Sequence, residues 1–259
     1  MTPTKKKKGK TARLDTLLVE RGLAESIAKA QAMILAGGIR VDGQAHAKAG
    51  ALFPISARVE IAGGGSRYAS RGGMKLEGAL EDFGVGVANK ICLDVGSSTG
   101  GFTDCLLQHG ARRVYAADVS VDQLAWKLRQ DPRVVLIEKN ARYLRPEDLS
   151  AAAAELATID VSFISVATIL PAVVAAVSPS AEFLILVKPQ FELPRAEVGE
   201  GGIVRDPALH ERAIERVRAA AVAAGLAIVG VRASQLTGAE GNQEFFIHAL
   251  GSRLKSRAS

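Results

Sequence analysis

Four apolar runs, each long enough to be a buried strand, carry a charged residue at or near their C-terminal end. They are residues 90–95 with Asp94, 113–118 with Asp118, 156–160 with Asp160, and 182–188 with Lys188. The carboxyl ends of parallel strands meet at one edge of a sheet, so we expect these side chains to lie close together. A lysine buried at such a tip is costly unless it is paired or used, which makes Lys188 a candidate functional residue.

A loop of small residues, Gly96-Ser-Ser-Thr-Gly-Gly101, follows the first of these runs. Phe102 and Leu106 then stand at helical spacing, and strand, small-residue loop and helix together form a ligand cradle of Rossmann-like sheets. The dinucleotide fingerprint needs glycine at position 98, where this chain has Ser98. Asp94 disfavours a pyrophosphate and suits a cationic ligand.

Asp118 stands 24 positions after Asp94, where an acid can accept both hydrogen bonds of a ribose diol. A turn-initiating aspartate is the structural alternative. A nucleoside with a sulfonium charge satisfies both acids and needs no phosphate site, so the predicted cofactor is S-adenosylmethionine. A third strand over 133–137 leads to Asn140 and Ala141, which we predict to border the adenine. The candidate cofactor residues are Asp94, Gly96, Ser97, Ser98, Thr99, Gly100, Gly101, Phe102, Asp118, Val119, Asn140 and Ala141.

Positive charge is concentrated at the front of the chain. Residues 1–50 hold ten lysines and arginines against four acids, and this net charge of +6 equals that of the whole chain. Such asymmetry predicts a basic end that meets a polyanion. Residues 1–12, with five lysines, are expected to be a disordered basic arm.

A small α+β module is predicted over residues 13–62. Its expected elements are a helix over 13–21, a second helix through Ile27, Ala30 and Ile34 ending at Gly37, a strand over 39–41 and a turn at Asp42-Gly43. Residues 63–70 form the expected linker.

An α/β domain is predicted over residues 71–250, and a short tail over residues 251–259. A helix carries Leu76, Leu80 and Phe83 inward, with Lys75 at its start, where a cation is unusual. Residues 161–181 lack charge but contain prolines and serines, so we predict a core helix and turn and no membrane span. Residues 190–204 are expected to form a lid-like loop, followed by a helix from Pro207 to Gly225 and strands over 226–231 and 244–250. The predicted fold is a mostly parallel seven-stranded sheet with one antiparallel strand and helices on both faces.

Metal, disulfide and export signals are lacking in the sequence. Cys92 and Cys105 flank the loop and are interpreted as small core residues. The four histidines have no metal-ligand spacing, and the basic N-terminus is not followed by the apolar run of a signal peptide.

The front module resembles the RNA-binding fold named after small-subunit ribosomal protein four. The matching residues are Arg13-Leu-Asp15, Leu18, Gly22-Leu23, Ser26, Ala28, Ile34, Gly37 and Ile39-Arg-Val-Asp-Gly43. That family usually has arginine after the motif serine, whereas this chain has Ile27, and Lys29 is the candidate replacement. The predicted RNA-binding residues are Lys5, Lys6, Lys7, Lys8, Lys10, Arg13, Lys29, Arg40, Arg67 and Arg71.

The body resembles the FtsJ-like ribose 2′-O-methyltransferases, which use a Lys-Asp-Lys-Glu tetrad. The motifs that carry the resemblance are Ser70-Arg-Gly-Gly-Met-Lys75, Asp160-Val-Ser-Phe-Ile-Ser165, Val187-Lys-Pro-Gln-Phe-Glu192 and Gly241-Asn-Gln-Glu-Phe-Phe246. The resemblance implies Lys75, Asp160, Lys188 and Glu244 as the catalytic residues. Lys188 would accept the proton of the 2′-hydroxyl or polarise its oxygen; burial and Lys75 favour its neutral form, whereas Asp160 and Glu244 favour the ammonium.

Both modules in this order resemble the TlyA family, often labelled hemolysin. The resemblance implies a cytoplasmic enzyme that methylates cytidines of 23S ribosomal RNA, with 16S RNA as an additional candidate, and ribosomal subunits as partners. Three alternatives stay open: an RNA-binding assembly factor with an inactive methyltransferase fold, a membrane-lytic protein, and a pseudouridine synthase. The last would need another catalytic aspartate motif and no cofactor loop.

Overall fold

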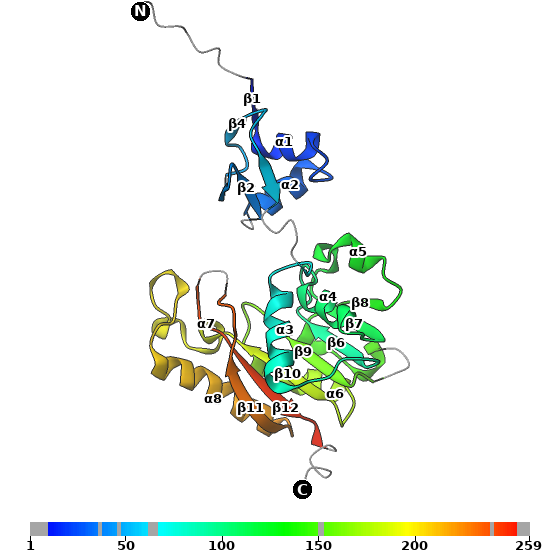
Figure 1. Cartoon of the computed structure of the whole chain (residues 1–259). Helices are drawn as coiled ribbons and strands as arrows, with labels where there is room; N and C mark the ends of the chain where they lie inside the picture. Colours follow the sequence, from blue (N-terminus) through cyan, green and yellow to red (C-terminus); the bar gives the residue numbers. More distant parts are fainter. Residues whose placement is uncertain are drawn as a thin grey trace, which may run out of the picture. The chain divides into compact units, whose positions relative to one another are not determined.

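The computed structural model describes residues 10–35, 38–45, 48–61, 67–149, 153–238 and 241–252. The chain divides into two compact units, residues 1–66 and 67–259, which are described separately (Figure 1). Residues 1–9 of the expected basic arm, with Lys5–Lys8, residues 63–66 of the expected linker and residues 253–259 of the tail lie outside the described residues. The expected arm of residues 1–12 is too long, because Thr11 and Ala12 belong to β1 (Thr11–Arg13).

The smaller unit combines two helices with short strands. Its elements are β1 (Thr11–Arg13), α1 (Leu14–Glu20), α2 (Ile27–Leu35), β2 (Ile39–Val41), β3 (Gln44–Ala45), β4 (Leu52–Pro54) and β5 (Val59–Ile61). β1 pairs antiparallel with β4, and β2 lies between β3 and β5. Leu14, Leu18, Ala30, Ile34 and Ile39 form the centre of its core. The predicted α+β module is therefore confirmed.

The first helix starts one residue later than predicted, because Arg13 belongs to β1. Ala12 pairs with Phe53, and the Leu14 amide donates to the Ala51 carbonyl at 2.9 Å, which places the chain before Leu14 in an extended conformation. Next to it, the buried Asp15 carboxylate accepts hydrogen bonds from Arg13 and Gln31. The bond to Arg13 holds the pKa of Asp15 well below its usual range.

The larger unit is built on one seven-stranded sheet in the order β11-β12-β10-β9-β6-β7-β8. The strands are β6 (Ile91–Val95), β7 (Arg113–Asp118), β8 (Val134–Glu138), β9 (Leu156–Ile159), β10 (Glu182–Val187), β11 (Ala227–Ala233) and β12 (Phe245–Leu250). Among the described strands of this sheet, β12 alone runs in the direction opposite to the other six. This confirms the predicted sheet, with strand limits displaced by one or two residues at several ends.

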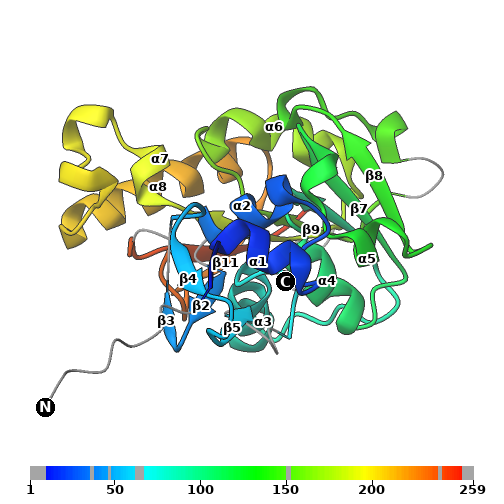
Figure 2. The same ribbon diagram turned by 90° about the horizontal axis from the view of Figure 1, so that it is seen from above.

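Helices cover both faces of this sheet. The helices are α3 (Gly72–Phe83), α4 (Gly101–Gln108), α5 (Trp126–Arg129), α6 (Val166–Ala176), α7 (Pro189–Glu192) and α8 (Pro207–Ala223). α3 and α4 pack on one face around Leu76, Phe102 and Leu106, whereas α6 and α8 pack on the other around Leu170 and Val217. Figure 2 shows these pairs on opposite sides of the strands. The predicted core helix is α6.

Two predicted segments differ from the structure. Residues 67–70, expected in the linker, belong to the larger unit, because Tyr68 is buried and the Ala69 amide donates to Asp104 at 2.7 Å. Residues 190–204 are not a plain loop. They continue α7 and form 3-10 turns over 195–197 and 200–202, and the Val204 amide donates to the buried Asn242 at 2.8 Å.

Among the described residues, no helix is long and apolar enough to cross a membrane. The same part of the chain contains no cluster of three or more histidine, cysteine or acidic side chains that could hold a metal ion. Cys92 and Cys105 are free and buried, as expected for core residues.

Candidate active site

The strand order reverses beside β6, which pairs with β7 on one side and β9 on the other. In open sheets of this kind, ligands bind at the carboxyl ends of the strands at such a reversal. The segments that follow β6 and β9 approach each other closely at this point. A Cβ atom on Gly96 would lie 2.1 Å from the Asp160 carbonyl oxygen, and Gly96 has φ +85°. Only glycine fits this position.

Two adjoining hollows open at this edge, and both are bordered by Gly96, Ser98, Asp160 and Ser162. The smaller one, ≈ 240 Å³, is also lined by Arg71, Lys75, Ser97, Thr99, Gly101, Phe102, Lys188 and Thr237. The larger one, ≈ 540 Å³, is also lined by Asp118, Val119, Gln123, Asn140, Ala141 and Phe163. Ten of the twelve predicted cofactor residues therefore line one or both hollows.

Gly100 is one of the two exceptions. Its φ is +96°, and a Cβ atom there would lie 2.3 Å from Leu128 and 2.9 Å from Leu124. Gly100 therefore lets the loop pack closely on these leucines and does not line a hollow. Ser97, three residues earlier in the same loop, does line the smaller hollow. Its buried hydroxyl has no hydrogen-bond partner among the described residues. An unpaired buried hydroxyl at a hollow is available to a ligand.

Asp94 is the second exception, and its prediction as a direct cofactor ligand is not supported by its position. The side chain is fully buried, and its two oxygens accept hydrogen bonds from Thr103 at 2.6 Å and Thr158 at 3.2 Å. Burial raises the pKa of Asp94 to about 7. Because it lies inside β6, its carboxylate joins the strand to α4 and β9 instead of facing the crevice.

Asp118 ends β7 and lines the larger hollow, as predicted. Its carboxylate accepts backbone hydrogen bonds from Ser98 at 2.9 Å and Ser120 at 3.1 Å. These amides fix the carboxylate at the crevice and tie it to the glycine-containing loop. Asn140 caps the turn that follows β8, since its side chain accepts from the Arg142 amide at 3.0 Å.

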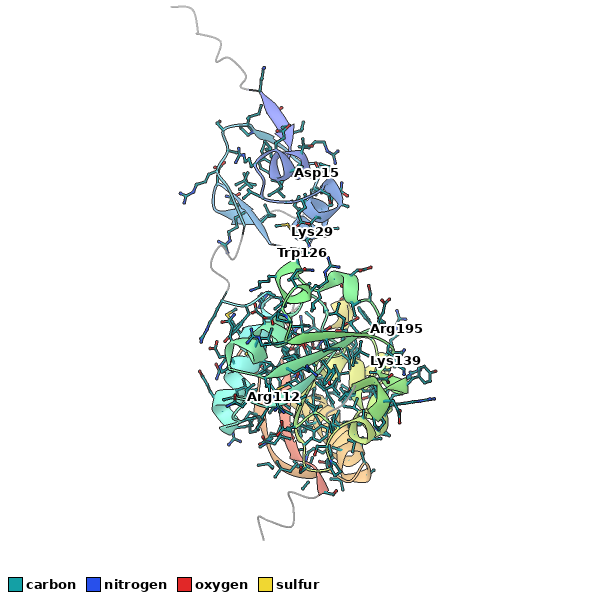
Figure 3. All side chains as sticks on the ribbon, turned by 90° about the vertical axis from the view of Figure 1, so that its right-hand side faces the viewer. Asp15, Lys29, Arg112, Trp126, Lys139 and Arg195 are labelled. Atoms are coloured by element: carbon teal, nitrogen blue, oxygen red, sulfur yellow. The ribbon has the colours of Figure 1, made fainter. Side chains whose placement is uncertain are left out.

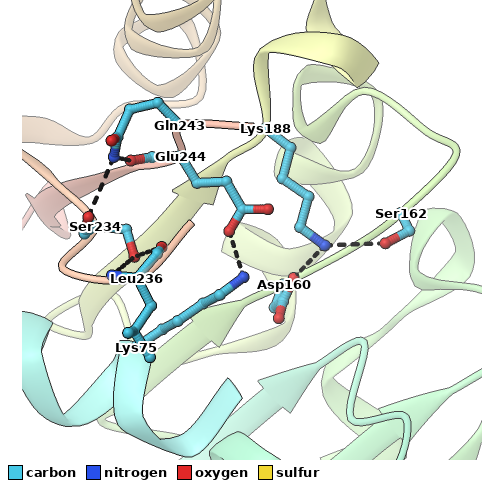
Figure 4. Close-up of polar contacts among 8 residues, drawn as sticks. All are labelled: Lys75, Asp160, Ser162, Lys188, Ser234, Leu236, Gln243 and Glu244. Carbon is cyan, nitrogen blue, oxygen red and sulfur yellow. Dashed lines mark hydrogen bonds and ion pairs between the residues drawn. The ribbon is translucent and has the colours of Figure 1, made fainter. Parts of the chain in front are cut away.

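The four predicted tetrad residues come together as two ion pairs (Figure 4). Lys75 Nζ lies 2.5 Å from Glu244 Oε2, and Lys188 Nζ lies 2.6 Å from Asp160 Oδ1. Lys188 also donates to the Ser162 hydroxyl at 2.9 Å. With both lysines and both acids ionised, the set has no formal net charge.

Four separate elements position the tetrad. Lys75 is in the first turn of α3, Asp160 follows β9, and Lys188 follows β10. Glu244 precedes β12, whose antiparallel pairing of Phe245 with Val187 brings it to the same edge. Lys75 and Lys188 side chains are only 11% and 12% exposed, so their long stems are packed and their amino groups are held in place.

Glu192 links the two strand ends that carry Asp160 and Lys188. This buried carboxylate accepts from the Ser165 hydroxyl at 2.5 Å and the Val166 amide at 2.7 Å, at the start of α6. It lies one helical turn after Lys188, and burial raises the pKa of Glu192. No role for Glu192 follows from the sequence, because a buried acid in a motif is indistinguishable from a surface acid by sequence alone.

Ser162 and Phe163, which follow Asp160 closely, were also not singled out from the sequence. Ser162 contacts Lys188, whereas Phe163 is 91% exposed and has φ +65°, an unusual backbone conformation for a bulky residue. The Phe163 ring lies 5.2 Å from that of Phe191, at the edge of the larger hollow. The exposed Phe163 ring offers an aromatic face at the site. Hydrophobicity alone would have assigned this side chain to the core.

The predicted RNA-binding residues that the structure describes are all exposed: Lys10, Arg13, Lys29, Arg40, Arg67 and Arg71. Two of them are occupied by acids in the structure, since Arg13 pairs with Asp15 and Arg67 with Glu77. Arg71 lines the smaller hollow beside Lys75.

Comparison with protein families accounts for both units. Residues 68–250 match the family described as FtsJ-like methyltransferase, and residues 12–46 match the S4 domain.

Individual relatives are similar over nearly the whole chain. The 16S/23S rRNA (cytidine-2′-O)-methyltransferase TlyA of Mycobacterium tuberculosis is 48% identical over 238 residues, 91% of this chain and 88% of that protein. Hemolysin A of Brachyspira hyodysenteriae is 41% identical over 242 residues, 91% of this chain and 98% of that protein. A solved structure named as a hemolysin, from Streptococcus thermophilus, aligns with a TM-score of 0.74 at 41% identity and covers 93% of this chain and 89% of that one.

Proposed function

The chain belongs to the TlyA family of FtsJ-like methyltransferases, and we propose that it methylates the ribose 2′-hydroxyl of a cytidine in ribosomal RNA. The methyl donor in this proposal is S-adenosylmethionine, and the place of action is the cytoplasm, where ribosomes are found. The observation that carries the proposal is the pair of lysine–carboxylate contacts beside the glycine-containing loop at the sheet reversal.

The residues of the larger hollow fit the nucleoside part of this donor. Asp118 presents a fixed carboxylate at the strand tip, which suits a ribose diol. Asn140 and Ala141 border the same hollow and are assigned to the base. The loop from Gly96 to Phe102, with the unpaired Ser97 hydroxyl, is assigned to the amino acid end of the donor.

The side of the smaller hollow bordered by Lys75 and Lys188 is assigned to the acceptor ribose, opposite the loop that is assigned to the donor. When bound, S-adenosylmethionine supplies a methyl group on a positively charged sulfur, with a neutral thioether as leaving group. The chain must therefore align the acceptor oxygen and manage its proton. Lys188 is assigned to that oxygen, because its amino group lines the hollow and is oriented by Asp160 and Ser162.

The second pair supports the first. Lys75 also lines the smaller hollow, and the buried Glu244 holds its amino group. The Glu244 backbone is fixed in turn, since its carbonyl accepts from the Ser234 amide at 2.8 Å. It also accepts from the Gln243 side-chain amide at 2.8 Å (Figure 4). We assign Lys75 to contacts with the acceptor nucleotide and Glu244 to the positioning of Lys75.

Ribosomal RNA is proposed as the substrate on two grounds. The S4 domain carries exposed basic residues, among them Lys29 and Arg40, and RNA affinity depends strongly on contacts with phosphate groups. The relatives named as methyltransferases act on cytidines of ribosomal RNA. The FtsJ-like match over residues 68–250 favours a methyltransferase over a pseudouridine synthase.

Nucleotide-resolution mapping of 2′-O-methylation tests the proposal. Unmethylated ribosomal subunits are incubated with the full chain and S-adenosylmethionine, and new methylated cytidines are expected in the wild-type reaction alone. Lys188→Ala is the matched control. Binding of RNA and S-adenosylmethionine without methyl transfer would instead support the inactive assembly factor.

A further inference from the structure

Trp126, the only tryptophan of the chain, is 61% exposed on the larger unit (Figure 3). It begins α5, a helix of four residues in the connection between β7 and β8. Tryptophan is a large apolar side chain that stabilises a protein when buried and is enriched at binding surfaces. An exposed indole near a candidate active site is therefore a candidate binding surface.

The segment that carries Trp126 is attached to the rim of the candidate active site. Leu124 and Leu128 are buried against Gly100, and the Ala125 amide donates to the Thr99 carbonyl at 3.2 Å. Thr99 lines the smaller hollow, one side of which is assigned to the acceptor ribose. Trp126 therefore directly follows Ala125, the residue whose amide contacts the glycine-containing loop of the site.

The indole is also held in orientation. The Arg129 guanidinium carbon lies 5.5 Å from the centroid of the Trp126 ring, and Arg129 Nη1 lies 3.5 Å from Asp122 Oδ1. Arg129 thereby occupies one side of the ring and adds positive charge to it. A planar group that approaches the exposed part of the ring meets an aromatic surface backed by a cation.

Lys127 adds a second positive charge beside the ring. Its side chain is 60% exposed, and its amino group pairs with Asp104 at 2.7 Å. An ammonium group has three donors, so Lys127 can contact a phosphate oxygen while it keeps this pair. An aromatic face with adjacent lysine and arginine is the composition of single-stranded nucleic acid sites, where bases stack and cations meet the backbone.

We propose that Trp126 is a stacking platform for a base of the substrate RNA next to the acceptor nucleotide, with Lys127 contacting the phosphate backbone. The inference rests on the proposed function and extends it by naming a surface of the methyltransferase domain that binds RNA. Stacking tolerates any base, so the platform holds the strand while sequence is selected elsewhere. The competing occupant of this surface is the chain's own smaller unit.

Intrinsic fluorescence distinguishes these occupants, because Trp126 is the only tryptophan. In the free full chain, we expect acrylamide to quench its emission as it does an exposed indole. Protein-free 23S RNA, at a concentration that saturates binding in a filter assay, should reduce this quenching several-fold. An indole already shielded in the free chain, or one equally quenched in the saturated complex, would overturn the proposal.

Methylation kinetics on ribosomal subunits test the consequence for turnover. Trp126→Ala should lower kcat/KM for the subunits roughly 10- to 100-fold, mainly through KM, as expected for the loss of one stacked base. S-adenosylmethionine affinity should change less than about twofold, and Trp126→Tyr should restore most of the loss because it keeps a stacking ring. Val222→Ala removes a similarly exposed apolar side chain from α8 and should have no effect.

The outcomes separate this inference from the proposed function. Wild-type kinetics in Trp126→Ala, or an equal loss of cofactor affinity, would contradict the platform and leave methyl transfer intact. Absence of methyl transfer by the wild-type chain would contradict the proposed function, while RNA-dependent shielding of Trp126 would still test the platform.

Discussion

In the larger unit, one lysine–carboxylate pair lies where β10 begins and another lies where β10 ends. We call these two sides of the sheet the amino edge and the carboxyl edge, after the ends of β10 that lie there. At its amino end, Glu182 lies 2.6 Å from Lys90 Nζ and 3.3 Å from His248 Nε2. At its carboxyl end, Lys188 lies 2.6 Å from Asp160. The contacts are equally short, and the two carboxylates are similarly exposed, at 20% and 21%.

The surroundings of the two pairs differ. Lys188 and Asp160 line the smaller hollow, beside the loop that leaves β6, whereas Lys90, Glu182 and His248 line neither active-site hollow. The same interaction therefore has two uses in one strand. We infer that at the amino edge it stabilises the fold, and that at the carboxyl edge, under the proposed function, it orients the Lys188 amino group toward the acceptor.

Replacing Lys188 should give the largest effect on catalysis. Lys188→Ala removes the group assigned to the acceptor oxygen and should lower kcat by about 10³-fold, or ~4 kcal/mol in the activation free energy. S-adenosylmethionine affinity, measured by calorimetry, should stay within about threefold. Lys188→Arg should not restore turnover, because a guanidinium has a different shape and stays protonated. Near-normal turnover in Lys188→Ala would remove the distinction between the edges.

Glu192 should have the next largest effect, because it joins the start of α6 to the segment after Lys188. Glu192→Ala should lower kcat about 10- to 100-fold by loosening the alignment of Lys188 with Asp160. Glu192→Gln keeps an acceptor for the Val166 amide and should recover most of the rate. Equal losses of rate in both variants, or a loss only in KM, would argue against a positioning role.

Asp118 tests the cofactor side of the carboxyl edge. Asp118→Ala should weaken S-adenosylmethionine binding by about 1–3 kcal/mol, the scale for leaving hydrogen-bonding groups unpaired. RNA binding should not change, since Asp118 lies in the larger hollow. Calorimetry is the direct measurement, and unchanged affinity would place the nucleoside elsewhere.

Glu182 tests the amino edge and should give the smallest effect on turnover. His248 and Lys90 lower the pKa of Glu182 to about 2, from an ordinary value of 4.5. Because the folded state binds this proton less tightly, the pair stabilises the fold above about pH 4.5 and the contribution disappears as pH falls toward 2. Glu182→Gln should therefore lower the free energy of unfolding at pH 7 by about 1–2 kcal/mol, with turnover within about twofold.

Urea unfolding at several pH values measures the Glu182 effect. The difference between wild type and Glu182→Gln should be constant from pH 7 to about 5 and shrink in more acidic solution. A loss of turnover without a loss of stability would give the amino edge a catalytic role and contradict the comparison.

Much of the sheet was predictable because its central strands are continuous apolar runs that end in charged residues. Asp118, Asp160 and Lys188 mark the carboxyl edge in the sequence itself, and their convergence follows from parallel pairing. The grouping of Lys75, Asp160, Lys188 and Glu244 as one catalytic set, by contrast, came from motif resemblance. The proximity of Glu244 to Lys75 depends on the antiparallel pairing of β12, which no local pattern specifies.

The residues that the structure places differently from the expectation, or that the sequence did not single out, depend on burial and close packing. Asp94 has the charge expected of a ligand, but threonine hydroxyls from α4 and β9 enclose it. Arg13 has helical propensity, but pairing of β1 with β4 makes it extended. Phe163 is apolar and yet 91% exposed, and its backbone has a positive φ of +65°. Each outcome is decided by contacts distant in sequence.

The most direct test of the central claim compares the two ends of β10 in one experiment. Methyl transfer to ribosomal subunits and the free energy of unfolding are measured for wild type, Lys188→Ala and Glu182→Gln. We predict that Lys188→Ala loses about three orders of magnitude in transfer rate, far more than its loss of stability accounts for, and that Glu182→Gln loses stability but transfers methyl groups at the wild-type rate. Equal effects of the two substitutions on transfer would contradict the account.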